Sequence, residues 1–179
     1  NSKLIIINVV SKQYAMTGFR IGWAVANNKL IEVMTNIQGH ETSVPSAVLQ
    51  HAAAAPINGL QSSVDIMCTP RETNSDVLTQ ELKAFDGVRL EEPGGTFYSF
   101  PDFSHYDKDS VRLSKFLLEK EQVVTVPGIE FGTEGHLRLS FCGSIKDITD
   151  GIERIKWALD PNAPNELYIG ERKLVRDWS

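Results

Sequence analysis

A lysine and an arginine stand eight residues apart in SKQYAMTGFRIG, residues 11–22 of this 179-residue chain. A neutral lysine amine attacks an aldehyde, whereas an arginine fork donates two parallel hydrogen bonds to a phosphate or a carboxylate. Free lysine titrates near 10.4, so bringing Lys12 to about 7 needs burial or nearby positive charge, a bias of roughly 4–5 kcal/mol. We expect Tyr14, Met16 and Arg20 to contribute that bias. On spacing alone, a solvated loop lysine is the commoner interpretation.

Both candidate anion-binding arginines belong to segments that alternate like β-strands. In residues 20–26, Arg20 shares a face with glycine and alanine residues, which leaves room for something bulky to approach. In HLRLSF, residues 136–141, Arg138 lies on the face opposite the leucines. The competing interpretation for each is an ion pair with one of the 23 acidic residues. For Arg138 the two interpretations are equally supported.

The elements expected around these residues indicate an α/β chain. The apolar run at residues 3–10 predicts a strand covered on both faces, typical of a parallel sheet. Its sheet neighbours are not expected within the chain, so we expect a larger sheet that was cut, with an edge prone to self-association. Helical patterns follow at residues 28–37, 46–55 and 60–85. Pro70 interrupts the third and predicts a kink or break, so we divide the chain at a hinge into residues 1–69 and 70–179.

The second part mixes short strands and helices and predicts a small α/β lobe. A turn at EEPGG separates two short strands, and a helix is expected at residues 109–120. Strands are expected at 123–126 and 136–141. Ser144 and Asp147 form a capping box for a helix with an apolar stripe. The tail from Asp160 is rich in proline and asparagine and is expected to be extended.

Composition excludes several classes of function. The formal net charge is −5, which disfavours nucleic acid and anionic membranes as partners, and no apolar stretch approaches the length of a membrane span. Two cysteines do not make a disulfide framework, and a reducing cytoplasm is the default. The four histidines lack the spacing of metal ligands, so no metal site is expected.

The segment SKQYAMTGFRIG resembles the cofactor-lysine signature of class I/II aminotransferases, the aspartate aminotransferase family of fold type I. That signature requires a small residue, lysine, then small, apolar, glycine, arginine, apolar and glycine positions in order. The segments PGGTFYSFPD and VPGIEFGTEGHLRLSF are also similar to this family and follow in the same order. The matching signature positions are Ser11, Lys12, Ala15, Met16, Gly18, Arg20, Ile21 and Gly22.

The resemblance implies a role for each candidate residue. Lys12 would form the internal Schiff base with pyridoxal 5′-phosphate and later carry the substrate's α-proton. Arg20 would hold the cofactor phosphate with help from the Ser11 hydroxyl, and Arg138 would bind the substrate α-carboxylate. The cofactor would be the electron sink, and the protein would supply grip and orientation.

The resemblance also implies that this is the C-terminal portion of such an enzyme, comprising the end of the large-domain sheet and the small α/β C-terminal domain. Family chains are more than twice as long, so the full-length protein is expected to be the enzyme and this piece alone to be inactive. The expected substrates are an amino acid and a 2-oxo acid, bound at the interface of a homodimer. Aspartate is the family's nominal amino acid, and aromatic, branched and other amino acids stay open. The alternatives are the cofactor-sensing effector domain of a transcription regulator, and a lyase or synthase of the same fold.

Overall fold

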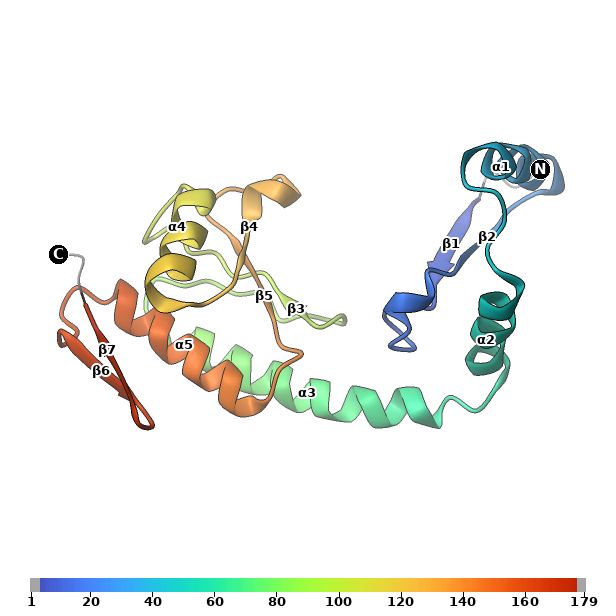
Figure 1. Ribbon diagram of the computed structural model, residues 1–179. Helices are drawn as coiled ribbons and strands as arrows, with labels where there is room; N and C mark the ends of the chain where they lie inside the picture. Colours follow the sequence, from blue (N-terminus) through green and yellow to red (C-terminus); the bar gives the residue numbers. More distant parts are fainter. Residues whose placement is uncertain (1–3, 177–179) are drawn as a thin grey trace. The chain divides into compact units, whose positions relative to one another are not determined.

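The computed structural model describes residues 4–176, and the chain divides into two compact units, residues 1–67 and 68–179 (Figure 1). Both units mix helices with antiparallel strands. The functional division at residue 70 into the end of a large domain and a small domain stays a prediction. None of the helices described between residues 4 and 176 has the length and apolar character needed to cross a membrane.

The first unit begins with a strand pair whose connection carries the lysine signature. β1 (Ile6–Val9) pairs antiparallel with β2 (Gly22–Val25), from Ile6 opposite Val25 to Val9 opposite Gly22. A 3-10 turn, η1 (Thr17–Phe19), lies between them, and helices α1 (Asn28–Glu41) and α2 (Ala47–Asn58) follow. The buried apolar residues of this unit are few: Val10, Ile21 and Ala53.

A strand of a parallel sheet is covered on both faces, but within the described chain β1 is not. Ile6 is 50% exposed and Ile7 is 72% exposed. Among residues 4–176, β2 is its one sheet partner, and the pairing is antiparallel. No described helix or strand covers these side chains, so the expectation that the strand is buried in a larger sheet stays a prediction. The expected absence of sheet neighbours agrees with this exposure.

Two helices continue through prolines that were expected to end them. α2 includes Pro56, and α3 (Ser62–Lys83) runs through Pro70 without ending. The break predicted at Pro70 is wrong. Pro70 is exposed and the preceding turn carries Ile66, which is 72% exposed. The carbonyl that loses its helical donor is therefore on a solvated part of the helix, where water replaces the missing hydrogen bond.

The second unit is built on a three-stranded antiparallel sheet with the order β3-β5-β4. These strands are β3 (Tyr98–Ser99), β5 (Leu137–Ser140) and β4 (Val126–Pro127). β4 is shorter and later than the strand expected at residues 123–126. The helices are α4 (Ser110–Phe116), continued by a π-helical turn, η2 (Leu117–Glu121), and α5 (Ile145–Leu159); a 3-10 turn, η3 (Gly128–Phe131), follows β4.

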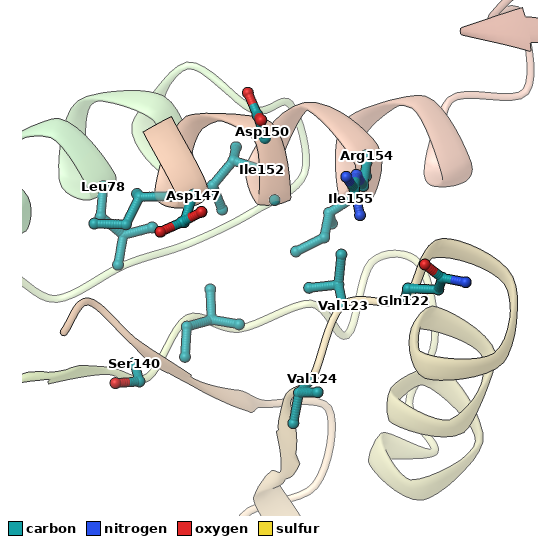
Figure 2. A pocket seen from close by; sticks show the side chains of 13 residues that line it. Leu78, Gln122, Val123, Val124, Ser140, Asp147, Asp150, Ile152, Arg154 and Ile155 are labelled. Carbon is teal, nitrogen blue, oxygen red and sulfur yellow. The ribbon is translucent and has the colours of Figure 1, made fainter. Parts of the chain in front are cut away.

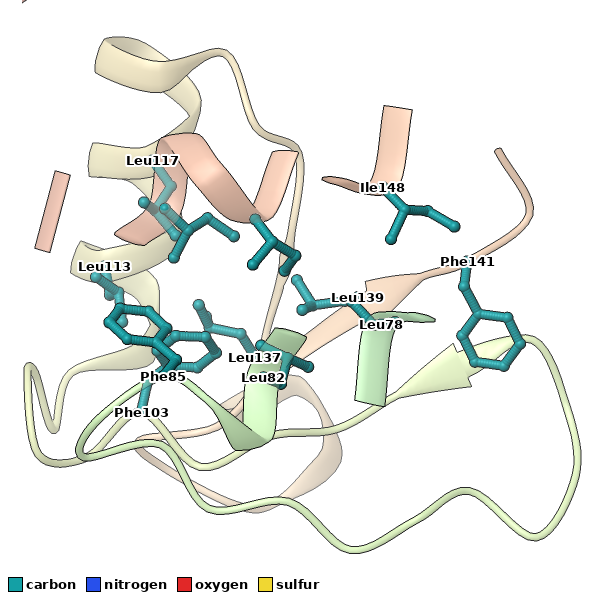
Figure 3. Packing of buried hydrophobic residues seen from close by; sticks show 12 residues of the cluster. Leu78, Leu82, Phe85, Phe103, Leu113, Leu117, Leu137, Leu139, Phe141 and Ile148 are labelled. Carbon is teal, nitrogen blue, oxygen red and sulfur yellow. The ribbon is translucent and has the colours of Figure 1, made fainter. Parts of the chain in front are cut away.

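One continuous core holds this unit together (Figure 3). Leu78 and Leu82 of α3 meet Leu137 and Leu139 of β5, and Ile148 of α5 packs into the same cluster. Each fully buried side chain of this kind contributes about 1.5–3 kcal/mol relative to exposure. The alternation predicted for residues 136–141 is confirmed, since the leucines of β5 are buried.

The ends of α5 are fixed by two different devices. The predicted capping box is confirmed at the start: the Asp147 backbone N–H donates to Ser144 Oγ, and Asp147 Oδ2 accepts from the Ser144 N–H and hydroxyl. These two hydrogen bonds, the hydroxyl first, lower the pKa of Asp147. At the other end, Arg176 donates to the carbonyls of Trp157 and Asp160, so a cation satisfies helix C-terminal acceptors.

The C-terminal tail is a folded hairpin and not the extended segment that was expected. β6 (Glu166–Ile169) pairs antiparallel with β7 (Arg172–Val175). Gly170 lies in the turn with φ of 59°, a conformation that favours glycine. The Trp157 indole N–H donates to the Pro164 carbonyl at 2.6 Å and fastens the tail to α5. The proline and asparagine content obscured the apolar residues that build the two strands.

A buried asparagine links α3 to the turn between β5 and α5. Asn74, 5% exposed, donates from Nδ2 to the carbonyls of Phe141 at 2.9 Å and Gly143 at 2.8 Å. We expect Asn74→Ala to lower the free energy of unfolding by about 1–3 kcal/mol, because two carbonyls lose their donor. Urea denaturation followed by circular dichroism measures this. Thr73→Ala, an exposed change on the same helix, should stay within about 0.5 kcal/mol of wild type; equal stability of both variants would contradict the assignment.

The exposed strand β1 predicts that the 179-residue chain self-associates, because unpaired backbone and bare aliphatic side chains invite pairing with another copy. Light scattering over a range of concentrations checks this. Ile7→Lys should weaken the association, since it puts a charge on the strand. Leu60→Lys makes the same change at a residue that is 90% exposed and outside the strand, and should weaken it less. A wild-type chain that stays monomeric at high concentration would show the prediction to be wrong.

Candidate active site

The segment from Val10 to Ile21 is a closed connection between β1 and β2. The Val10 N–H donates to the Ile21 carbonyl at 3.2 Å, and both side chains are buried, at 0% and 8% exposed. Because Val9 pairs with Gly22, every residue between them lies at one end of the hairpin. The structure therefore brings Ser11, Lys12 and Arg20 together in one connection, as the signature requires.

Short backbone hydrogen bonds shape this connection. The Tyr14 N–H donates to the Val10 carbonyl at 3.2 Å, and the Ala15 N–H donates to the Lys12 carbonyl at 3.3 Å. Ala15 and Arg20 adopt left-handed backbone conformations, with φ of 53° and 54°. Such conformations cost of order 1–3 kcal/mol for residues other than glycine and cluster at functional sites. The turn is therefore held in a shape that its own backbone preferences do not favour.

Side chains brace the same turn. Thr17 Oγ1 donates to the Ser11 carbonyl, and Arg20 Nη1 donates to the Thr17 carbonyl, both at 3.1 Å. The Tyr14 hydroxyl donates to Gln61 Oε1 at 3.3 Å, while its ring packs beside Val10. Tyr14 is therefore anchored in the first unit's core, and Lys12 is on the exposed side of the turn.

The residues that are near this connection in sequence carry positive charge and no acid. No aspartate or glutamate occurs among residues 4–31, whereas Lys12, Arg20 and Lys29 all do. Within the described part of the chain, no carboxylate pairs with Arg20, whose side chain instead bonds a backbone carbonyl. The ion-pair interpretation of Arg20 therefore finds no support there, and most of its N–H donors stay available. The missing acids are a signal that sequence reasoning overlooked.

Two glycines of the signature differ in the space that surrounds them. A Cβ at Gly22 would lie 2.7 Å from Val9 Cγ1 and 2.9 Å from the Asn8 carbonyl, so the strand pairing itself requires glycine. A Cβ at Gly18 would meet no described atom within 4 Å. The packing of the described residues thus gives no reason for glycine at position 18, and the open space there suits a group that approaches the backbone. The residues of this connection fit a phosphorylated aldehyde.

Arg138 belongs to the second unit and lies on the sheet face opposite the core. It stands in β5 between the buried Leu137 and Leu139 and is paired with Val126. Its guanidinium carbon is 4.2 Å from the ring centroid of Tyr98 and 4.8 Å from that of Phe131. The two aromatic residues were not identified from the sequence, although both belong to the quoted segments PGGTFYSFPD and VPGIEFGTEGHLRLSF.

The loop that carries Phe131 is pinned to the start of α4. Glu134 Oε2 accepts from the Ser110 N–H at 3.0 Å and from the Ser110 hydroxyl at 2.8 Å, which lowers the pKa of the Glu134 carboxyl. The hydroxyl oxygen of Ser110 accepts from the Ile129 N–H at 3.2 Å. Ser110 is 0% exposed, so this network fixes the loop from inside the unit.

A hollow described in the second unit does not belong to this site. It lies between α5 and the segment that follows η2, lined by Leu78, Val123, Ile152 and Arg154 among others (Figure 2). The two acidic side chains of this hollow already have partners, since Asp147 belongs to the capping box and Asp150 pairs with Lys146. None of the four predicted site residues lines it.

Other reactive side chains do not form a second centre. Between residues 4 and 176, no group of three or more histidine, cysteine or acidic residues is placed to hold a metal ion. Cys68 and Cys142 are both exposed and not bonded to each other. Cys68 lies on the solvated part of α3, and Cys142 follows the end of β5.

Known proteins of one family are similar to this chain along nearly its whole length. Residues 1–155 match the sequence family described as aminotransferase class I and II. The aspartate aminotransferase of Streptomyces avermitilis is 36% identical over 163 residues, which cover 86% of this chain and 40% of that protein. That of Bacillus subtilis is 37% identical over 157 residues, covering 85% and 40%. The chain therefore spans about 40% of the length of these relatives.

Solved structures support the fold. The crystal structure of an aromatic aminotransferase from Pyrococcus horikoshii is similar with a TM-score of 0.82 and 29% identity, covering 87% of this chain and 42% of that one. The aspartate aminotransferase from Thermotoga maritima has a TM-score of 0.79 at 33% identity, covering 87% and 40%. The expected fold class, part of a fold type I transferase, is thereby confirmed. This chain belongs to the class I and II aminotransferase family.

Proposed function

We propose that the full-length protein is an aminotransferase that moves an amino group between an amino acid and a 2-oxo acid with pyridoxal 5′-phosphate. The observation that carries the proposal is the closed connection from Val10 to Ile21, where an amine, a hydroxyl and a guanidinium share one turn whose own residues include no acid. The names of the relatives favour aspartate as one substrate, although an aromatic aminotransferase is also similar.

Lys12 and Arg20 have complementary tasks in this proposal. Lys12 Nζ would hold the cofactor at its aldehyde carbon, with release of water, and the amine, once freed by an amino acid, would take the proton from the substrate's α-carbon. Arg20 donates its available N–H groups to the cofactor phosphate, and Ser11 adds its hydroxyl. Bound pyridoxal phosphate supplies a ring that accepts electrons from the bonds at the α-carbon.

Arg138 binds the α-carboxylate that every amino acid and 2-oxo acid substrate carries. Within the described residues it has no ion pair, so its fork is available for a bidentate contact. We further infer that the enzyme acts as a homodimer in the cytoplasm, with the remaining cofactor contacts supplied by residues outside this chain. The 179-residue piece is then inactive alone.

The cofactor amine can be identified chemically. Pyridoxal 5′-phosphate is added to the chain, the adduct is reduced with borohydride, and the modified peptides are mapped by mass spectrometry. We expect preferential labelling of Lys12, because Arg20 and Ser11 of the same turn can donate to the phosphate of the aldehyde that reaches its amine. Lys12→Ala should abolish the preferred label, whereas Lys29→Ala, a lysine of the same unit, should leave it in place. Labelling spread evenly over all lysines would count against the proposal.

The phosphate contact can be separated from the amine. Arg20→Gln should reduce labelling of Lys12 by pyridoxal 5′-phosphate about ten-fold or more, since a charge-assisted hydrogen bond contributes about 1.5–3 kcal/mol. Labelling by pyridoxal, which lacks the phosphate, should change little. Competition between the two aldehydes on wild type and variant measures the ratio. An equal loss with both aldehydes would mean that Arg20 supports the turn and does not contact the phosphate.

A further inference from the structure

We propose that Tyr98 and Phe131 are positioning residues that hold the Arg138 guanidinium ready for a carboxylate. The guanidinium carbon lies 4.2 Å from the Tyr98 ring centroid and 4.8 Å from the Phe131 ring centroid. Both distances are within the range of a cation–π interaction. We call the pair of rings the aromatic cradle. The inference deepens the proposed function and rests on it, because the bound carboxylate is that of the amino acid or 2-oxo acid.

An aromatic cradle, unlike a carboxylate, leaves the N–H donors of the guanidinium available. A ring attracts the cation through its face and takes none of the five N–H donors of the guanidinium. In residues 4–176, Arg138 forms neither a side-chain hydrogen bond nor an ion pair, although it is half-buried. In a chain with 23 acidic residues, the cradle therefore holds the charge in place while keeping the fork open to an incoming anion.

The sheet register fixes Tyr98 beside Arg138. Tyr98 pairs with Ser140, two residues along β5 from Arg138, so both side chains lie on the same face. The opposite face carries Ser99 and Leu139, which are buried in the core at 2% and 6% exposed. A shift of one residue would send the ring into the core and lose the contact. The packing that buries β5 thereby also positions Tyr98.

Phe131 is braced from the other side. Its ring makes an edge contact with Phe100, at 5.7 Å between centroids, and Phe100 stacks on His136 at 5.0 Å. Phe131 ends η3, whose backbone is held by the Ile129 N–H bond to Ser110 Oγ. The second ring of the cradle is therefore attached to a fixed loop.

A held guanidinium binds carboxylate more tightly than a mobile one, because ordering a long side chain on binding costs free energy. In the full-length enzyme, Tyr98→Leu should raise KM for both the amino acid and the 2-oxo acid about two- to five-fold. We expect kcat to change less, since the reacting atoms are not touched. Tyr98→Phe keeps the ring and should restore the wild-type KM. Tyr168→Leu, an exposed tyrosine of the C-terminal hairpin, is the matched control and should have no effect.

A double-mutant cycle separates positioning from general support. If Tyr98 acts through Arg138, Tyr98→Leu should change kcat/KM no further in an Arg138→Gln background. Phe131→Leu should behave in the same way. An unchanged KM in the single variants would overturn the inference, and so would an equal loss in both backgrounds.

A spectroscopic measurement on the 179-residue chain tests the cradle apart from activity. The Arg138 Nε–H signal is assigned by its loss in Arg138→Gln, and ring currents should displace it from the other arginine signals. Tyr98→Leu should move it back toward them. A displaced signal in this chain, together with a full-length protein that does not transaminate, would uphold the cradle and refute the proposed function. An active enzyme whose Arg138 signal is not displaced would refute the cradle alone.

Discussion

The pairing of Val9 with Gly22 is the constraint on which the candidate cofactor site depends. This pairing sets the length of the connection between β1 and β2. The hydrogen bond between Val10 and Ile21, whose side chains are both buried, closes the connection next to the strands. A Cβ at position 22 would collide with Val9, so the glycine is part of the closure. Because Lys12 and Arg20 both lie inside this closed turn, the turn fixes the separation of their backbones.

The two arginines keep their donors available in different ways. Arg20 bonds one backbone carbonyl in its own turn, whereas Arg138 lies against aromatic rings. A carboxylate partner would satisfy either guanidinium but would compete with an incoming anion. The described chain, although acidic overall, places no carboxylate against either of them. An excess of acidic residues in the composition therefore does not predict whether a particular arginine has a carboxylate partner.

The features that sequence reasoning predicted are those encoded by local pattern. Alternation located β5 and the face of Arg138, and the spacing of Ser144 and Asp147 specified the capping box. Features that depend on what surrounds a segment were missed. An apolar run such as β1 predicts burial only if something covers it, and Pro70 breaks a helix only if the freed carbonyl cannot reach water. The contact of Tyr98 with Arg138 is set by strand register, which no single segment specifies.

The two units differ in how completely they are stabilised from within. The second has a cluster of 12 buried apolar residues, so the surroundings of Arg138 are rigid before any ligand arrives. The first buries only three apolar residues in its described part and leaves the isoleucines of β1 bare. Its left-handed residues at positions 15 and 20 store strain that so small a core does not easily balance. We therefore infer that the surroundings of Arg138 are preformed in this chain, whereas the turn from Val10 to Ile21 gains rigidity only when β1 is covered.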